Sequence, residues 1–273
     1  MLCYSKFQQI DDVYLSMLEL LTVSEKVTTR NSTVHRIMGL TATFQETPLI
    51  SIRKTAWKTA LREWEWFMSG SSNIKDLHPS VKSWWEPWAN EAGEIPNNYS
   101  KQLRKFENSK GQFDQIEFLI KGIKEHPYSR RNILTTWNSA DMADSETPIT
   151  NCHNSLTFFY VEDNKLSLHT TQRSADMLLG VPHNWIQEWA FLMYMAHRTG
   201  FEVGEVIWVG LDCHLYENHI DFAKEMFNNW DEIDYLVPNH LVYTPSSEEF
   251  KADDFSLSME YNPIINKRAP MTV

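Results

Sequence analysis

The chain has 273 residues, of which 42% are hydrophobic and 13% aromatic, so it can bury a sizeable core. Its formal net charge of −11 argues against a general nucleic-acid surface, because a phosphate backbone requires clustered Lys and Arg. Three scattered cysteines do not make a disulfide framework, which favours a reducing compartment. The amino terminus has no leader pattern, and no stretch approaches the ~20 apolar residues of a membrane span. We therefore expect a cytoplasmic protein that binds neither nucleic acid nor membranes.

Hydrophobic spacing predicts the elements in chain order. Amphipathic helices are expected over residues 10–21, 55–68 and 113–123, and short β-rich segments over residues 133–137, 156–161, 166–170 and 203–209. Residues 185–197 are apolar on nearly all sides and precede Gly200, which is typical of a buried central helix. The mixture predicts an α+β fold, a mixed sheet covered by helices. Without repeats or linkers, residues 1–273 form one predicted domain.

The middle of the chain carries a group of chemically suited residues. Cys152 lies between Asn151 and His153, and about twenty residues later comes Gln172-Arg173-Ser174-Ala175-Asp176. Gly180, Pro182, Asn184 and the segment Asp212-Cys213-His214-Leu215-Tyr216 follow. A thiol beside a guanidinium that would hold it ionised suits nucleophilic chemistry on a small phosphorylated heterocycle. An inert, buried cysteine is the ordinary alternative, and it is our interpretation of Cys213, which follows an apolar strand.

These residues resemble the thymidylate synthase family, whose members add a folate-borne one-carbon unit to C5 of a pyrimidine nucleotide. The resemblance covers nearly the whole chain and includes Ser129-Arg130-Arg131, Glu63 before Trp66-Phe67, Trp84-Trp85 with Trp88, Tyr99 and a terminal Val273. It implies a homodimer that pairs through one face of the sheet. It also implies 5,10-methylenetetrahydrofolate as the cosubstrate, with no metal.

The resemblance assigns roles to individual residues. Cys152 would attack C6 of the base, with Glu63, Tyr99, His153, Arg173 and Asp176 as the other catalytic residues. The 5′-phosphate of dUMP would be bound by Arg30, Arg173 and Ser174, with Arg130 and Arg131 donated by the partner subunit, and the sugar hydroxyl by His214 and Tyr216. Folate would contact Trp84, Trp85, Asp176, Gly180, His183 and Val273. The alternatives are solvated arginines, a satisfied core His/Tyr pair and an exposed helix glutamate.

Asn184 is the candidate base reader. A side-chain amide can donate to O4 and accept from N3–H of uracil, whereas cytosine presents the reverse pattern, so we expect dUMP as the substrate. The alternative is an N-cap of the helix that is expected to begin near residue 185.

The sequence leaves the product open. Asn151 stands in place of a proline expected before the cysteine, and Glu63-Trp64-Glu65-Trp66 and Asn98-Tyr99 resemble phage deoxycytidylate hydroxymethylases. If Glu65 and Asn151 hold water near an exocyclic methylene, the product is 5-hydroxymethyl-dUMP, and this deoxyuridylate hydroxymethylase is the function that we favour from the sequence. The alternative is thymidylate synthase, in which hydride gives dTMP. An inactive nucleotide-binding protein is the remote alternative.

Overall fold

One six-stranded mixed sheet organises the fold of this computed structural model, which describes residues 9–29, 32–235, 237–267 and 269. Its strand order is β1-β2-β8-β7-β6-β5. The strands of this sheet are β1 Lys26–Thr28, β2 Thr33–Phe44, β5 Ile133–Leu134, β6 Leu156–Glu162, β7 Lys165–Asp176 and β8 Glu202–Tyr216. Two hairpins lie outside it: β3 Phe106–Asn108 with β4 Gly111–Phe113, and β9 Leu241–Tyr243 with β10 Phe255–Leu257.

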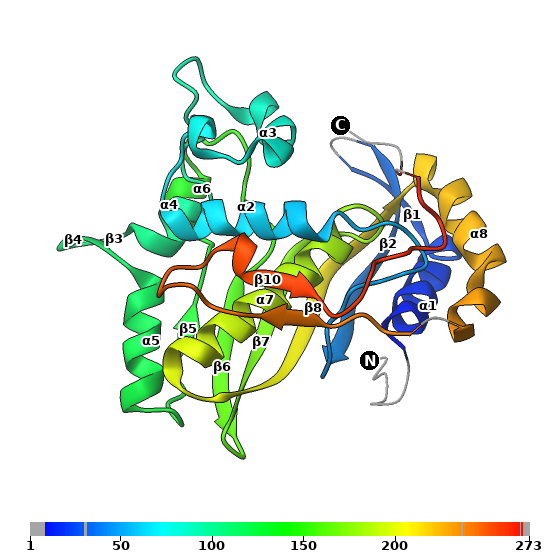
Figure 1. The fold of residues 1–273 in the computed structure, drawn as a ribbon. Helices are drawn as coiled ribbons and strands as arrows, with labels where there is room; N and C mark the ends of the chain where they lie inside the picture. Colours follow the sequence, from blue (N-terminus) through cyan, green and yellow to red (C-terminus); the bar gives the residue numbers. More distant parts are fainter. Residues whose placement is uncertain (1–8, 30–31, 236, 268, 270–273) are drawn as a thin grey trace.

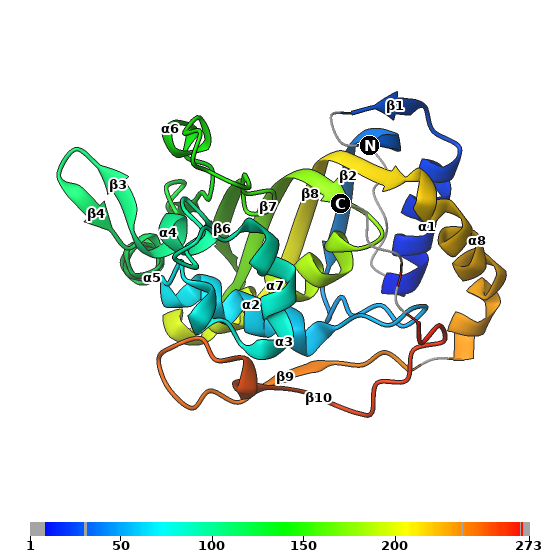
Figure 2. The ribbon, with the colours of Figure 1, turned by 90° about the horizontal axis from the view of Figure 1, so that it is seen from above.

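The helices are α1 Ile10–Thr22, α2 Trp57–Ser69, α3 Pro79–Trp85, α4 Tyr99–Arg104, α5 Gln115–Glu125, α6 Ser139–Met142, α7 Gly180–Thr199 and α8 Ile220–Asn228. Short 3₁₀ turns occupy Ile74–Asp76, Glu86–Trp88, Glu217–His219, Trp230–Tyr235 and Ala252–Asp254. Figure 2 shows α7 and α2 on one face of the sheet, with the β9–β10 hairpin outside these helices. The helices α1 and α8 lie at the β2 end (Figure 1). The predicted mixed sheet covered by helices is confirmed.

Strands β7 and β8 are the parallel pair of the sheet, and α7 is the crossover between them. Parallel strands end at the same edge, so the carboxyl ends of β7 and β8 meet. Ser174 lies opposite Asp212, and Asp176 lies opposite His214. The topology thus brings together two motifs that are about forty residues apart in the sequence.

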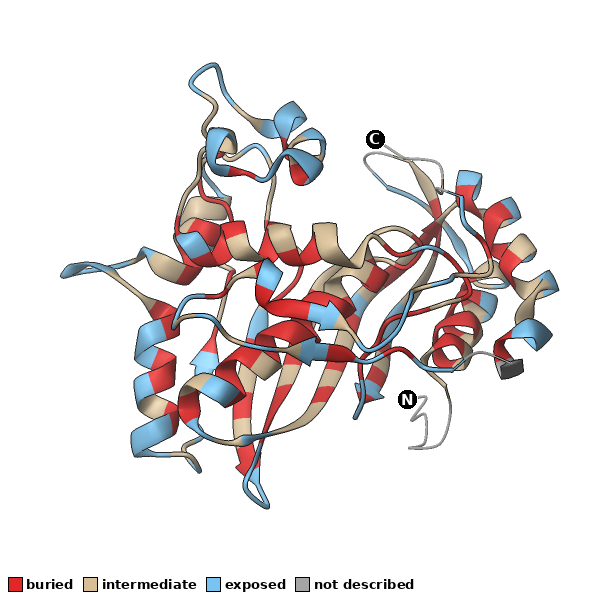
Figure 3. Cartoon of the chain, viewed as in Figure 1, coloured by how far each residue is buried: buried red, intermediate tan, exposed pale blue. Residues whose placement is uncertain are grey.

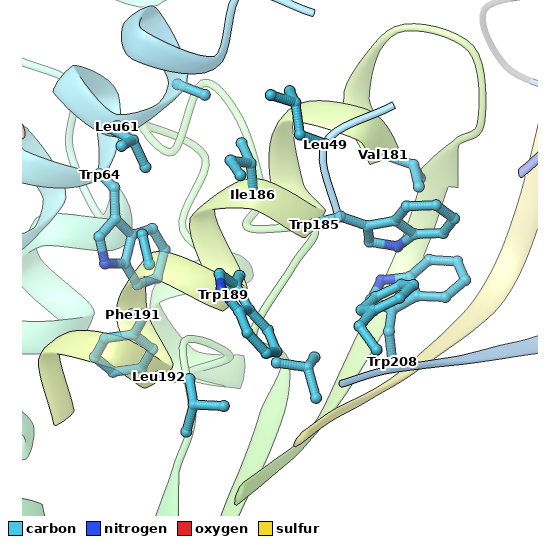
Figure 4. Close-up of a cluster of buried hydrophobic side chains, with 14 of the residues drawn as sticks. Leu49, Leu61, Trp64, Val181, Trp185, Ile186, Trp189, Phe191, Leu192 and Trp208 are labelled. Carbon is cyan, nitrogen blue, oxygen red and sulfur yellow. The ribbon is translucent and has the colours of Figure 1, made fainter. Parts of the chain in front are cut away.

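Helix α7 is buried along most of its length, as the sequence predicts (Figure 3). Trp185 packs edge-on against Trp208 of β8 at 5.5 Å between ring centroids, and Phe191 packs against Trp64 of α2 at 5.1 Å. Figure 4 shows these rings within one apolar cluster between helix and sheet. Full burial of such an aromatic side chain stabilises the fold by about 2–3 kcal/mol.

A glycine permits close packing beside this cluster. A Cβ added to Gly210 of β8 would lie 2.4 Å from Cys213 Sγ and 2.4 Å from the Trp208 ring. Both atoms belong to buried side chains, so neither can move away at little cost. Gly210 is therefore required by packing and not by backbone conformation.

Several predicted boundaries were wrong. Helix α5 begins at Gln115 because Asp114 accepts hydrogen bonds from the N–H groups of Ile116 and Glu117, and Phe113 belongs to β4. Helix α7 begins at Gly180, five residues before the predicted start, and β5 is only two residues long. The long strand β2 was not predicted at all.

The sheet face opposite α7 keeps apolar side chains at the surface. Met38 of β2 is 62% exposed, Leu156 of β6 is 49% exposed and Leu211 of β8 is 43% exposed. Phe158 and Tyr160 stack on the same side of β6 as Leu156, with ring centroids 6.0 Å apart. An apolar face of this kind favours association with another chain, and the predicted dimerisation through it stays a prediction.

Candidate active site

The candidate nucleophile Cys152 lies in the loop that precedes β6. Its thiol donates to the carbonyl of Thr150 at 3.4 Å, and Nη2 of Arg173 lies 3.4 Å from the same sulfur. Burial raises the pKa of the Cys152 thiol, and the Arg173 guanidinium opposes this in part. The predicted guanidinium is thus present. Burial has the larger effect, so the net change is a pKa above that of an ordinary thiol.

Arg173 of β7 holds the loop around Cys152 in place and also faces the Cys152 sulfur. Its Nε donates to the carbonyl of Asn151 at 2.7 Å and its Nη2 to the carbonyl of Thr150 at 2.9 Å. The guanidinium also lies over the Trp137 ring, 5.1 Å from the centroid. These contacts leave the guanidinium oriented toward the sulfur, and its predicted contact with a phosphate remains untested.

Tyr99, the first residue of α4, anchors the same loop from the other side. Its hydroxyl oxygen accepts hydrogen bonds from the backbone N–H groups of Cys152 at 2.6 Å and of His153 at 3.2 Å. Burial raises the pKa of Tyr99 well above its ordinary value, so the phenol stays neutral. Tyr99 therefore positions the nucleophile and retains its own proton.

Glu63 is a buried carboxyl group on α2. Its Oε1 accepts from Trp85 Nε1 at 2.6 Å, and its Oε2 accepts from Gln187 Nε2 at 2.8 Å. Burial raises the pKa of Glu63, while these hydrogen bonds and the proximity of His153 oppose the rise. The exposed-helix alternative is wrong, and a carboxyl with a raised pKa is suited to carrying a proton near neutral pH.

The observed environment of Trp85 differs from the one predicted from the sequence. It is only 7% exposed, packs against Trp66 and Phe67, and donates its indole N–H to Glu63. A flat surface open to folate was expected. In this structure Trp85 holds Glu63 in place, and its contact with folate stays a prediction.

Asn184 lies in the second turn of α7, where Leu179 is the N-cap residue. The predicted capping alternative is therefore wrong. Its Oδ1 accepts from Gln172 Nε2 at 3.0 Å, and its Nδ2 donates to Gln187 Oε1 at 3.2 Å. Sequence reasoning missed Gln187, although a polar residue in an otherwise apolar helix was an available signal.

His153 has a second buried carboxyl neighbour that sequence reasoning also missed. Glu188 of α7 lies with Oε1 3.6 Å from His153 Nδ1, and Asn154 Nδ2 donates to the same oxygen at 2.9 Å. Burial raises the pKa of Glu188, and hydrogen bonding with His153 is the first effect that opposes it. His153 thus lies close to two buried carboxyl groups, Glu188 and Glu63.

The predicted sugar-binding residues lie at the end of β8. His214 Nδ1 is 3.3 Å from the Asp212 carbonyl, and its ring meets the Tyr216 ring edge-on at 5.3 Å. Burial raises the pKa of Tyr216, and electrostatic interactions with Asp176 and with Cys152 add to this effect. Tyr216 is therefore near both residues, and Ser174 on β7 completes this edge.

The predicted folate residues gather around the start of α7. Asp176 Oδ1 accepts from the N–H groups of Leu178 and Leu179, both at 3.1 Å, which fixes its carboxylate. A Cβ on Gly180 would lie 3.7 Å from Asp176 Cβ and 3.6 Å from Asn184 Oδ1, so Gly180 stands between these two side chains at ordinary contact distances.

His183 has a fixed tautomer. Its Nδ1 lies 2.7 Å from the Leu179 carbonyl, to which it donates, and its Nε2 accepts from Ala56 N–H at 3.2 Å. Burial lowers the pKa of His183 to about 4, and the nearby Arg53 adds to this, so the ring is neutral near pH 7. It meets the Trp84 ring edge-on at 5.4 Å. The pair supplies an apolar surface beside Asp176.

Comparison with known proteins identifies this arrangement. The family model described as thymidylate synthase matches residues 17–273. The chain belongs to the thymidylate synthase family. The chain is 39% identical over 228 residues to a thymidylate synthase of Corynebacterium aurimucosum, covering 83% of this chain and 82% of that protein. It is 36% identical over 234 residues to that of Francisella philomiragia, covering 81% and 84%.

A solved structure agrees. Thermostable thymidylate synthase A from Bacillus subtilis superimposes with a TM-score of 0.83 at 28% identity, covering 97% of this chain and 99% of that one. The comparisons support the synthase alternative better than the hydroxymethylase that we favoured from the sequence.

Of the remaining predicted residues, two are exposed at the surface and two lie outside the described residues. Arg130 and Arg131 are exposed in the loop between α5 and β5. Arg30 and Val273 lie outside the described residues.

The two residues that favoured the hydroxymethylase are separated by the fold. Two residues apart on a helix, Glu63 and Glu65 point in nearly opposite directions. The Glu65 carboxylate accepts from Ala252 N–H at 3.1 Å and lines a groove of about 500 Å³ with Arg62, Trp66 and Ser69. The predicted placement of Glu65 near the reacting carbon is therefore wrong. Asn151 is beside Cys152, and its Nδ2 donates to the Thr136 carbonyl at 3.0 Å.

Within the described residues, His, Cys, Asp and Glu side chains form no group of three that could hold a metal ion. In the same part of the chain, no helix has the length and hydrophobicity of a membrane span.

Proposed function

We propose that this protein is a thymidylate synthase, which converts dUMP to dTMP through a covalent bond between Cys152 Sγ and C6 of the uracil. The observation that carries the proposal is the position of Cys152. It lies beside the Arg173 guanidinium, on a loop held by Tyr99, in a site that also contains a buried carboxyl and an oriented amide. The synthase names of the curated relatives support the same reaction.

The residues around Cys152 suit each stage of the reaction on dUMP. Arg173 would stabilise the thiolate as its proton leaves, and the sulfur would then add to C6. The electron pair of the C5–C6 double bond moves toward O4, where a protonated Glu63 would donate, and C5 becomes nucleophilic. Once the new bond to C5 has formed, the C5 hydrogen leaves as a proton to solvent and the amine that carried the carbon is expelled, which leaves an exocyclic methylene on the ring. Addition of hydride to this methylene returns an electron pair to the ring, so the sulfur leaves C6 and the C5–C6 double bond is restored.

Methylenetetrahydrofolate would supply the carbon and, for dTMP, the hydride. The residues present fit such a ligand. The Asp176 carboxylate is fixed through one oxygen, so the other can accept from a pterin amino group, and the neutral His183 ring with Trp84 offers an apolar wall. These side chains would orient the folate over the base and exclude water.

We further propose that the chain acts as one catalytic domain in a homodimer formed through the apolar sheet face. The exposed Met38, Leu156 and Leu211 support this association, and exposed Arg130 and Arg131 are free to reach a partner's phosphate site. Free thiols at Cys152 and Cys213 suit a reducing compartment such as the cytoplasm.

Deoxyuridylate hydroxymethylase is a second candidate because of one observation. The Oδ1 atom of Asn151 is buried beside Cys152 and has no hydrogen-bond partner in the described part of the chain. Such an oxygen could accept from a water molecule able to attack the exocyclic methylene.

One experiment separates the two products. The protein is incubated with dUMP and methylenetetrahydrofolate, and the nucleotides and folates are separated. We expect dTMP and dihydrofolate. Tetrahydrofolate with 5-hydroxymethyl-dUMP would support the second candidate, and retained dUMP binding without turnover would contradict both.

A further inference from the structure

Gln187 is a fully buried amide that joins the base reader to the catalytic carboxyl. Its Nε2 donates to the Ala60 carbonyl at 2.9 Å and to Glu63 Oε2 at 2.8 Å, and its Oε1 accepts from Asn184 Nδ2. The Ala60 carbonyl can only accept a hydrogen bond. The Gln187 amide therefore cannot turn over, and its oxygen must face Asn184.

Asn184 is fixed from its other side by an independent anchor. Trp208 Nε1, which can only donate, bonds to Gln172 Oε1 at 3.0 Å. This fixes Gln172 with its Nε2 toward the Ser174 carbonyl at 3.1 Å and toward Asn184 Oδ1 at 3.0 Å. The chain of hydrogen bonds thus has one direction, from Trp208 through Gln172, Asn184 and Gln187 to Glu63.

With these two hydrogen bonds formed, the Asn184 amide can still accept one hydrogen bond at Oδ1 and donate one from Nδ2. Uracil uses these through N3–H and O4, whereas cytosine requires the amide to be turned over. Turning it would place two N–H groups against each other at Gln172 and two oxygens against each other at Gln187. Gln172 and Gln187 are buried and Asn184 is half-buried, so on the glutamine side each mismatched group is shielded from solvent.

We propose that Gln187 is a specificity-determining residue of this site, which locks the Asn184 amide in the orientation that accepts uracil and rejects cytosine. The inference rests on the proposed use of dUMP. The inference goes beyond that proposal, because it assigns the discrimination between uracil and cytosine to a residue that does not itself touch the base.

The test compares binding of dUMP and dCMP, measured by calorimetry without folate, in four proteins. Gln187→Met keeps an unbranched side chain of similar length but removes both hydrogen-bonding roles. Gln187→Glu keeps an oxygen toward Asn184 and, as the protonated acid favoured by burial, one O–H toward the Ala60 carbonyl or Glu63. Gln115→Met is the control for losing a buried glutamine. Among the described residues, Gln115 of α5 donates to the carbonyls of Gln102 and Thr135 and accepts from the Thr135 N–H, so its hydrogen bonds do not include Asn184.

We expect the wild type and Gln115→Met to prefer dUMP equally. Gln187→Met should reduce the ratio of the two dissociation constants by about tenfold, and Gln187→Glu should recover most of it. Circular dichroism and thermal unfolding establish that each variant is folded. Discrimination by folded Gln187→Met equal to that of the wild type would overturn the inference.

Failure of the proposed function gives a different pattern. A wild type that prefers dUMP but makes no dTMP would contradict the synthase and leave the Gln187 inference standing. A wild type that prefers dCMP would overturn both.

Discussion

The loop around Cys152 and the strand around Cys213 place two thiols in opposite electrostatic surroundings, the first half-buried and the second buried. Cys213 lies between Ile37 and Ala175 on neighbouring strands, and burial raises its pKa to about 12, with the Asp212 charge adding to the rise. Burial also raises the pKa of Cys152, but there the neighbouring charge is Arg173 and acts in the opposite direction. Burial thus raises the pKa of both thiols, and the two sites differ in the sign of the adjacent charge, from which we predict that Cys152 is the reactive thiol.

The largest effect is expected from deleting each sulfur in turn. Cys152→Ala should lower turnover by roughly 10⁴-fold or more and abolish the covalent adduct with 5-fluoro-dUMP and folate, because it removes the nucleophile. Cys213→Ala should form the adduct normally. Mass spectrometry of the intact proteins is the measurement, and an adduct in Cys152→Ala would show that the nucleophile is misassigned.

Removal of the positive charge beside Cys152 should weaken the predicted contrast in reactivity between Cys152 and Cys213. Arg173→Met should lower turnover by about 10²-fold or more and shift alkylation of Cys152 by iodoacetamide to higher pH. The sign follows because the guanidinium favours the thiolate, so its loss raises the thiol pKa further and reduces the thiolate fraction at any given pH.

Arg36→Met is the matched control, since Arg36 pairs with Asp212 at 2.7 Å on the Cys213 side. Its alkylation profile at Cys152 should equal that of the wild type. An unchanged profile in Arg173→Met would remove the electrostatic basis of the comparison.

Around Cys213, in contrast, side-chain packing should determine the effect of substitutions on the free energy of unfolding. Gly210→Ala should reduce the free energy of unfolding by about 1–3 kcal/mol, because its Cβ would overlap Cys213 Sγ and the Trp208 ring. Adding Cys213→Ala should recover part of the loss, and a double-mutant cycle in urea measures the coupling. Strict additivity would mean that the two side chains do not compete for space.

The smallest effect should come from Cys213→Ala alone. Loss of one buried sulfur in a close-packed region should cost about 1 kcal/mol in the free energy of unfolding with no change in kcat. Urea unfolding monitored by circular dichroism checks the first part and the dUMP assay the second. A fall in kcat without loss of stability would give Cys213 a functional role that its environment does not indicate.

Parts of this protein follow from local pattern alone. Helical spacing predicted α1, α2 and the buried α7, and the flanking residues distinguished Cys152 from Cys213. Such signals can be interpreted without the structure, because hydrophobic periodicity and neighbouring polar groups belong to one continuous segment of the chain. The predicted first residues of helices were less accurate. Side-chain acceptors such as Asp114, and Asp176 with its bonds from the Leu178 and Leu179 N–H groups, outweigh hydrophobic spacing there.

The sequence by itself determined the family and the mixed α+β architecture, and it predicted a set of candidate site residues. Only the tertiary structure decided their directions: Glu65 turns away from the site, Trp85 supports Glu63, and Gln187 fixes Asn184. The physical reason is that hydrogen-bond partners are chosen across the fold, as in the contact of Gln187 with Glu63, which are 124 residues apart. No local pattern contains that contact, and packing of α7 against α2 creates it.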